Sequence, residues 1–178
     1  MSGEQPSLPK LWLLSDERND AKLEWAIATL PERSAFVFRH YFMKPKYRRQ
    51  RFDALAPIAR AGGHLLILSD EIDVAADWGA DGIYRHPTKM GRRDDLLRIA
   101  TAHNAREIFQ ANRNGADALF LSPVYPTRSH PGGACLGTMN FRDLAARSQI
   151  PVIALGGMDA EKAEELGCER WGAIDGLS

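Results

Sequence analysis

Short runs of consecutive apolar residues recur along the chain and constrain its fold more than any other feature. The clear runs hold three or four residues and end at turn signals such as Ser-Asp, Arg-His or Gly-Gly. Strands that are buried on both faces need such continuous hydrophobicity, which is typical of a parallel sheet. The clear runs are 11–14, 36–38, 65–68, 82–84, 118–121 and 152–155, with weaker candidates at 97–100 and 171–174.

Helical patterns occupy the segments between these runs. They place apolar residues three or four positions apart and stop at Pro or Gly, as the pattern before Pro31 does. Pro57 lies inside the second pattern and predicts a kink there. The helical segments are 20–31, 48–61, 71–78, 104–114, 140–148 and 159–166.

Strand and helix therefore alternate about eight times, which indicates an α/β protein. Eight parallel strands predict a closed (β/α)8 barrel, the TIM barrel, and an open doubly wound sheet is the alternative. No GxGxxG motif follows the first strand, which weakens a dinucleotide-binding interpretation. Since no linker or repeat divides the chain, we expect residues 1–178 to form a single domain.

The chain length makes this predicted barrel a compact one. Such barrels usually have about 250 residues, whereas this chain has 178. The fourth crossover, 90–96, is short, and Ser178 closely follows the eighth strand, so we expect no full eighth helix. The apolar surface that such a helix covers must meet the N-terminal segment or another subunit, which predicts a homodimer.

The composition argues against several classes of partner. The 23 Lys and Arg residues balance 23 Asp and Glu residues, which argues against a general nucleic-acid-binding protein. No apolar run approaches the roughly 18 residues of a membrane span, and the first residues lack the pattern of a signal peptide. The two cysteines, Cys135 and Cys168, are expected to be reduced thiols. We therefore expect a cytoplasmic protein without nucleic-acid or membrane partners.

Cationic side chains gather after three of the predicted strands. Because the loops after the strands form the functional face of a barrel, they predict a basic rim that attracts phosphate or pyrophosphate. The alternative for 44–51 is an ordinary solvated loop and helix start, and Tyr47 alone gives little support for stacking on nucleic-acid bases. The cations are Arg39, His40, Lys44, Lys46, Arg48, Arg49 and Arg51, then Arg85, His86, Lys89, Arg92 and Arg93, then Arg128 and His130.

Two loops strengthen the expectation of an anion site. Gly156 and Gly157 follow a buried strand and precede a helix, and glycines let backbone N–H groups approach an oxyanion closely. The alternative for this pair is a plain tight turn. The segment 122–130 is stiffened by two prolines and carries hydroxyl, guanidinium and imidazole donors.

The residues of these loops carry a resemblance to a known family. Gly115–Asp117, Ser122–Thr127 and Ile150–Met158 together resemble the thiamine phosphate synthase/TenI superfamily, and weaker matches extend over nearly the whole chain in the same order. The resemblance implies a (β/α)8 barrel. Its synthase members join hydroxymethylpyrimidine diphosphate to thiazole phosphate and release pyrophosphate with Mg²⁺.

The resemblance also assigns roles to residues of this chain. It implies that the thiazole phosphate binds at two glycines, that the pyrophosphate contacts an arginine and two hydroxyls, and that one aspartate is a metal ligand. Cations and Mg²⁺ stabilise the charge that develops on the leaving pyrophosphate. The residues are Gly156 and Gly157 for the phosphate, Arg39, Thr127 and Ser129 for the pyrophosphate, Asp70 for the metal, and Thr101 near the reacting centre.

Several positions depart from the family pattern. Val37 and Tyr41 stand where the family has Gln and Lys around Arg39, and Ser69 replaces the Asn before Asp70. Lys89 stands at the position of the second metal-binding aspartate, so either Lys89 supplies a cation in place of the metal or the metal site is lost. The lysine that closes the family's Thr-x-Thr-Lys segment is His130 here.

These features lead to one expected function and one alternative. We expect a thiamine phosphate synthase-like transferase with a small phosphorylated substrate, in which Arg39, Thr101, His103 and Thr127 are catalytic. The alternative is a TenI-like thiazole isomerase, or a non-catalytic binder of a phosphate ester that lacks the pyrimidine diphosphate and metal half-site. His103 follows a strand end and is a candidate acid or base, and the alternative for it is a helix-start residue that bonds backbone.

Overall fold

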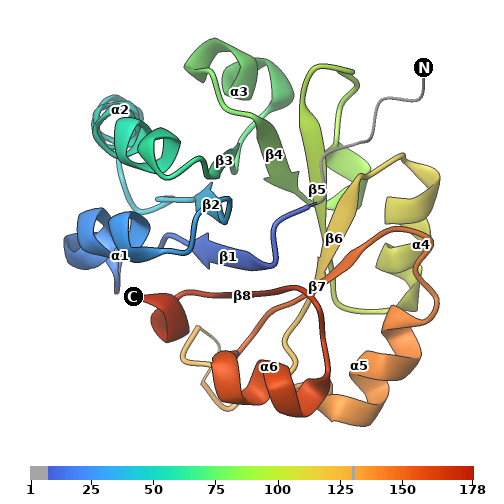
Figure 1. The fold of residues 1–178 in the computed structure, drawn as a ribbon. Helices are drawn as coiled ribbons and strands as arrows, with labels where there is room; N and C mark the ends of the chain where they lie inside the picture. Colours follow the sequence, from blue (N-terminus) through green and yellow to red (C-terminus); the bar gives the residue numbers. More distant parts are fainter. Residues whose placement is uncertain (1–7, 130) are drawn as a thin grey trace.

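The computed structural model describes residues 8–129 and 131–178, and within them eight parallel strands form a closed barrel. Each strand pairs with the next in the chain, and the pairing of the last strand with the first closes the ring. The closed (β/α)8 barrel is therefore confirmed over the open sheet (Figure 1). The strands are β1 (Leu11–Leu14), β2 (Ala35–Phe38), β3 (Leu65–Leu68), β4 (Gly82–Arg85), β5 (Leu97–Ala102), β6 (Ala118–Leu121), β7 (Val152–Ala154) and β8 (Trp171–Ala173).

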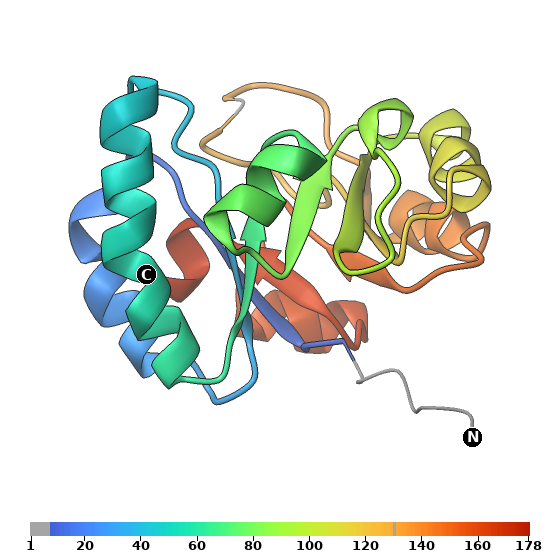
Figure 2. The ribbon, with the colours of Figure 1, turned by 90° about the horizontal axis from the view of Figure 1, so that it is seen from above.

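Helices surround this ring of strands on the outside (Figures 1 and 2). The second of them continues through Pro57, a residue that is exposed to solvent. Its start at Pro45 agrees with the preference of proline for the first helical turn. The helices are α1 (Leu23–Thr29), α2 (Pro45–Ala61), α3 (Ile72–Trp78), α4 (Ala105–Arg113), α5 (Gly137–Ala145) and α6 (Ala160–Leu166), with the 3-10 turn η1 (Asp20–Lys22) before α1.

Continuous hydrophobicity in the strands is explained by two apolar layers. One layer fills the barrel interior, where Trp12 and Tyr84 each meet the ring of Phe120 edge to face, with centroids 5.4 and 5.3 Å apart. The other lies between strands and helices, where Leu13 and Leu119 are fully buried. Neighbouring strand residues alternate between these layers, so both faces must be apolar.

The fourth crossover departs from the strand–helix alternation. Between β4 and β5 the chain forms only the 3-10 turn η2 (Pro87–Lys89) before it descends to the next strand, as the short segment 90–96 predicts. After β8 a single 3-10 turn, η3 (Asp175–Leu177), lies beside α1 in both views (Figures 1 and 2). Within the described part of the chain, no helix is both long and apolar enough to span a bilayer.

Candidate functional site

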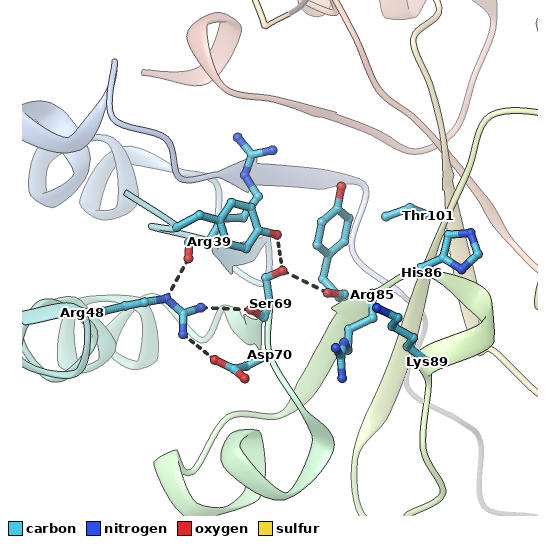
Figure 3. A pocket seen from close by; sticks show the side chains of 10 residues that line it. Arg39, Arg48, Ser69, Asp70, Arg85, His86, Lys89 and Thr101 are labelled. Atoms are coloured by element: carbon cyan, nitrogen blue, oxygen red, sulfur yellow. Dashed lines mark hydrogen bonds and ion pairs between the residues drawn. The ribbon is translucent and has the colours of Figure 1, made fainter. Parts of the chain in front are cut away.

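A pocket of about 650 Å³ lies at the end of the barrel where the strands finish (Figure 3). Parallel strands bring the residues after their carboxyl ends to one face, which is where barrel enzymes place their chemistry. Four of the predicted site residues, Arg39, Asp70, Lys89 and Thr101, line this pocket together. The other lining residues are Tyr41, Arg48, Ser69, Tyr84, Arg85 and His86.

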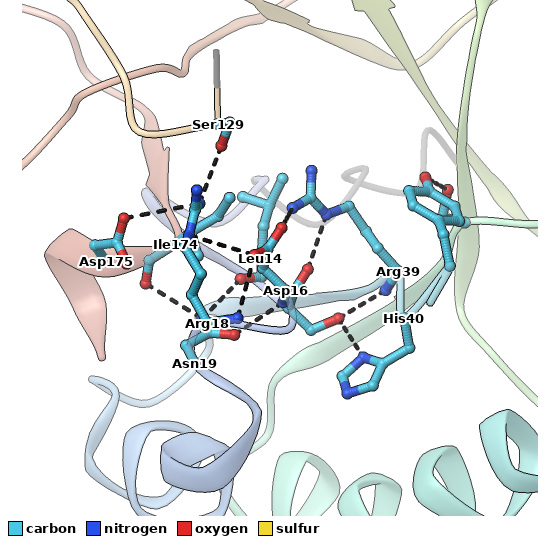
Figure 4. A network of polar contacts seen from close by, with 12 residues as sticks. Leu14, Asp16, Arg18, Asn19, Arg39, His40, Ser129, Ile174 and Asp175 are labelled. Atoms are coloured by element: carbon cyan, nitrogen blue, oxygen red, sulfur yellow. Dashed lines mark hydrogen bonds and ion pairs between the residues drawn. The ribbon is translucent and has the colours of Figure 1, made fainter. Parts of the chain in front are cut away.

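Arg39 follows β2 and is held in place by the end of β1. Its backbone N–H donates to Ser15 Oγ at 2.7 Å and its Nε donates to the Ser15 carbonyl at 2.8 Å (Figure 4). Its Nη2 donates to Asp16 Oδ2 at 2.9 Å. These bonds fix the guanidinium at the pocket wall before any ligand arrives, which lowers the entropy that binding costs.

A buried histidine, His40, holds the Ser15 side chain that bonds the backbone of Arg39. His40 has a left-handed backbone (φ +45°), stacks on Phe38 with ring centroids 4.3 Å apart, and lies 2.8 Å from both Ser15 Oγ and Asp20 Oδ1. Burial lowers the pKa of His40, so the neutral ring accepts from Ser15 at Nδ1 and donates to Asp20 at Nε2. Ser15 has no exposed surface, so this Ser-His-Asp chain positions Arg39 rather than attacking a substrate.

Arg48 reaches back from α2 and joins three parts of the pocket. Its Nε donates to the Arg39 carbonyl at 2.9 Å, its Nη2 to the Ser69 carbonyl at 2.9 Å, and its Nη1 to Asp70 Oδ2 at 2.5 Å. The guanidinium also lies 5.6 and 5.4 Å from the ring centroids of Phe38 and Trp78. Only 8% of the residue is exposed, so Arg48 is a fixed cation of the pocket wall.

Hydroxyl groups form the floor of the pocket. Ser69 donates to the Tyr84 carbonyl at 3.1 Å and accepts from the hydroxyl of Tyr41. Burial raises the pKa of Tyr84 to about 12, so its phenol stays protonated and is a hydrogen-bond donor at neutral pH. Tyr84 was missed as a site residue because its strand position identifies it only as a core residue.

Positive charge dominates the pocket lining. Its four cations, Arg39, Arg48, Arg85 and Lys89, share one lining carboxylate, that of Asp70, and outside the lining Asp16 pairs with Arg39. Arg85 is paired with Glu71, and this hydrogen bond holds the pKa of Glu71 below its ordinary value. Among residues 8–129 and 131–178, Lys89 has no ion-pair partner. The lining therefore suits an anion with several negative oxygens.

The same lining does not fit a divalent metal ion. Asp70 is engaged at both oxygens, since Oδ2 accepts from Arg48 and Oδ1 accepts from the Glu71 N–H at 2.8 Å. Mg²⁺ requires oxygen ligands in near-octahedral geometry, and the described residues contain no group of three His, Cys, Asp or Glu placed to hold a metal. Both oxygens of the Asp70 carboxylate are thus already hydrogen-bonded within the protein, beside the fixed guanidinium of Arg48.

Residues of the predicted pyrophosphate loop lie outside this lining. Ser129 Oγ accepts from Arg18 Nη2 at 3.0 Å (Figure 4). Thr127 Oγ1 accepts from the Ser129 N–H at 3.2 Å. Their roles as pyrophosphate contacts remain predictions. His130 lies outside the described residues.

Gly156 and Gly157 have the left-handed backbone that favours glycine, with φ of +98° and +65°. They pack closely on the loop after β6, because a Cβ at Gly156 would lie 2.6 Å from Pro123 Cα and one at Gly157 would lie 2.5 Å from the Pro126 carbonyl oxygen. Within the described residues, their N–H groups donate no hydrogen bond. The pair is thus a tight, close-packed turn with free donors.

His103 lies beyond the end of β5 and outside the pocket lining. Its Nδ1 and its backbone N–H both lie 2.8 Å from Glu107 Oε2, in the first turn of α4. Burial opposes ionisation of Glu107, but hydrogen bonds from His103 lower the pKa of that carboxyl. The structure therefore places His103 at a helix start, and its catalytic role stays a prediction.

The sequence predicted a single basic rim, and this prediction is wrong. Some of its cations are paired with acidic residues, and others lie in a separate hollow. Arg51 pairs with Asp20 at 2.7 Å, and Arg49 pairs with Asp53 at 2.9 Å along α2. The chain turns away after η2 and carries the next cations to a separate hollow of about 460 Å³ on another part of the barrel. That hollow is lined by Arg92, Arg93, Asp94, Arg98, Arg113, Asn114 and Gly115.

Known proteins resemble this chain in sequence over most of the barrel. The family model described as thiamine monophosphate synthase matches residues 11–172. The thiamine-phosphate synthase of Chloroflexus aurantiacus is 33% identical over 120 residues, which cover 63% of this chain and 55% of that protein. The thiamine-phosphate synthase of Methanobrevibacter smithii is 34% identical over 122 residues, which cover 64% and 56%. The chain thus spans a little over half the length of these relatives.

A more distant relative aligns over a larger share of the chain. The thiamine-phosphate synthase of Pyrococcus furiosus is 25% identical over 166 residues, which cover 88% of this chain and 79% of that protein. The solved thiamine phosphate pyrophosphorylase from Pyrococcus furiosus superposes with a TM-score of 0.77 at 22% identity and covers 93% of this chain and 85% of that one. The match of the family model to residues 11–172 shows that this chain belongs to the thiamine monophosphate synthase family.

Proposed function

We propose that this chain is a thiamine phosphate synthase, which couples hydroxymethylpyrimidine diphosphate to thiazole phosphate and releases pyrophosphate. The observation that carries the proposal is the pocket at the barrel mouth, where Arg39, Arg85 and Lys89 surround a volume of about 650 Å³. Membership of the family and the named synthases among the relatives support it.

The chemistry follows from the charge of the lining. When the bond between the pyrimidine methylene carbon and the diphosphate oxygen breaks, its electron pair stays on pyrophosphate, and the ring nitrogen of the thiazole then forms the new C–N bond. Arg39, which the protein holds in place, and Lys89, which has no ion-pair partner among the described residues, stabilise the charge on the leaving group. The protonated Tyr84 and the hydroxyl of Thr101 add neutral donors at the floor.

A direct assay tests this function. Purified protein is incubated with both precursors, with and without Mg²⁺, and thiamine phosphate is measured against an enzyme-free control. We expect product, and we expect Arg85→Met to lower its rate while Arg113→Met, an exposed arginine outside the pocket, leaves the rate unchanged. Absence of product at high enzyme concentration would overturn the proposal.

One observation favours a second function, binding of a phosphate ester without transfer chemistry. The free N–H groups of Gly156 and Gly157 offer donors to a phosphate, and this needs neither a metal nor the diphosphate pocket. Thiazole phosphate would then raise the melting temperature although no thiamine phosphate is formed in the assay above. Product formation would exclude this alternative.

We further propose that the chain forms a homodimer in the cytoplasm. Large apolar side chains on the neighbouring helices α4 and α5 support a subunit contact, since Phe109 and Met139 are more than half exposed. Both Cys135 and Cys168 are free thiols, as expected in a reducing compartment.

A further inference from the structure

We propose that the pocket binds the diphosphate group free of metal, with Lys89 supplying the positive charge that a divalent cation would otherwise provide. The identity of the ligand rests on the proposed function. The inference itself rests on three features of the pocket: an aspartate that is already neutralised, an arginine that cannot leave it, and an unpaired lysine.

The aspartate is neutralised from within the protein. Arg48 Nη1 lies 2.5 Å from Asp70 Oδ2, and the Glu71 N–H satisfies Oδ1 at 2.8 Å. A divalent cation on this carboxylate would have to displace the guanidinium or lie beside it, and like charges repel strongly at such separations in a half-buried site. Asp70 thus acts as an internal counter-ion to Arg48.

Arg48 has no alternative position to which it can withdraw. All three of its nitrogens donate, to Arg39, Asp70 and Ser69, and its plane lies against Phe38 and Trp78. Leaving this position would forfeit the hydrogen bonds and orphan two carbonyl groups at once. The charge state of the Asp70 position is therefore fixed by the fold.

Lys89 supplies the positive charge in place of a metal ion, from the opposite side of the pocket. It projects from η2 into the pocket that Arg48 and Asp70 bound on the other side (Figure 3). Its ammonium forms no ion pair among the described residues, although the ion pair with Arg85 and the charge of Lys89 both lower the pKa of the exposed Glu71. An ammonium offers three donors and binds phosphate oxygens as a point charge.

Mg²⁺ should therefore compete with the protein rather than assist it. The ion chelates pyrophosphate in solution and reduces its negative charge, and the cationic lining gains less from a ligand that is already neutralised. Binding of inorganic pyrophosphate to the intact chain, measured by titration calorimetry, should be tight in EDTA and weaker in excess Mg²⁺.

Two variants and one control separate the possibilities. Lys89→Met should weaken pyrophosphate binding in EDTA about tenfold or more, because it removes a charge-assisted hydrogen bond. Asp70→Asn should strengthen binding, because it removes a negative charge and keeps one acceptor oxygen for Arg48, although it gives up the hydrogen bond from the Glu71 N–H. Lys46→Met removes an exposed cation of α2 outside the lining and should change nothing.

The outcomes distinguish this inference from the proposed function. Pyrophosphate binding that requires Mg²⁺ and is lost in Asp70→Asn would overturn the metal-free site, yet leave a synthase standing if thiamine phosphate is formed. Tight binding in EDTA without any product from the two precursors would support the site and overturn the synthase. No binding in either buffer would overturn the inference, whatever the assay of product shows.

Discussion

Replacement of Arg48 by Met tests how firmly the fold holds the charge of the pocket. The change keeps an apolar stem of similar length against Phe38 and Trp78 but deletes hydrogen bonds to the Arg39 and Ser69 carbonyls and the ion pair with Asp70. Breaking a buried pair costs about 3–5 kcal/mol. Because the Asp70 side chain is 30% exposed, water compensates in part, and we expect a loss of about 3 kcal/mol.

Urea unfolding of the variant and its matched control measures this loss. In thermal unfolding, the same loss of stability should lower the melting temperature of a chain of this length by about 6–12 °C. Arg49→Met is the control, since Arg49 also lies over Trp78, at 5.1 Å, but its pair with Asp53 is exposed and is worth less than about 1 kcal/mol.

A double variant identifies the cause of the loss. If an orphaned carboxylate accounts for much of it, adding Asp70→Asn to Arg48→Met should restore about 1 kcal/mol or more. A loss in Arg48→Met no larger than in Arg49→Met would refute the reasoning, because Arg48 would then contribute no more than a surface arginine.

Three further predictions address the backbone, the pH dependence and the assembly. Gly156→Ala should lower the free energy of unfolding by about 2–4 kcal/mol, because its Cβ would lie 2.6 Å from Pro123. Gly132→Ala, where φ is +72° but the space around the Cβ is open, should lower it by only about 1–2 kcal/mol. Equal losses for the two variants in urea unfolding would contradict this prediction. Burial lowers the pKa of His40 and His64 below the ordinary 6.5, so the unfolded chain binds more protons than the folded one. The free energy of unfolding should therefore fall as the pH drops from about 6.5 through the folded pKa values. Urea midpoints that do not change with pH over this range would argue against this prediction. Light scattering after size exclusion should give twice the chain mass, and a monomer at micromolar concentration would rule out the homodimer.

The barrel was predictable from the sequence because its signal is local and repeated. A strand between two apolar layers must be apolar throughout, so 65–68 and 118–121 reveal β3 and β6 directly. Arg39, Asp70 and Lys89 were predictable as neighbours for a related reason, since residues after parallel strands share one face of a barrel.

The interactions within the pocket were not predictable in the same way. Arg48 lies in a run of cations that looks like any solvated helix start, and only the packing of α2 on β2 and β3 brings it to Asp70, 22 residues away. Likewise, no local pattern links Ser15 with His40, because their hydrogen bond joins β1 to the end of β2. Arg92 was misassigned to the rim because the crossover between β4 and β5 has only the turn η2 in place of a helix, and the sequence does not show where the chain runs beyond that turn.

The short fourth crossover carries one cation of the pocket, whereas other cations of the pocket belong to the core of the fold. Lys89 lies on one turn, η2, which Asn114 anchors to α4 through the Pro87 carbonyl at 2.8 Å. Arg39 and Arg48 instead belong to networks that reach into the core, so their replacement disturbs folding. Lys89 is exposed and, among the described residues, belongs to no such network, so its replacement can alter the charge of the pocket at little cost to stability.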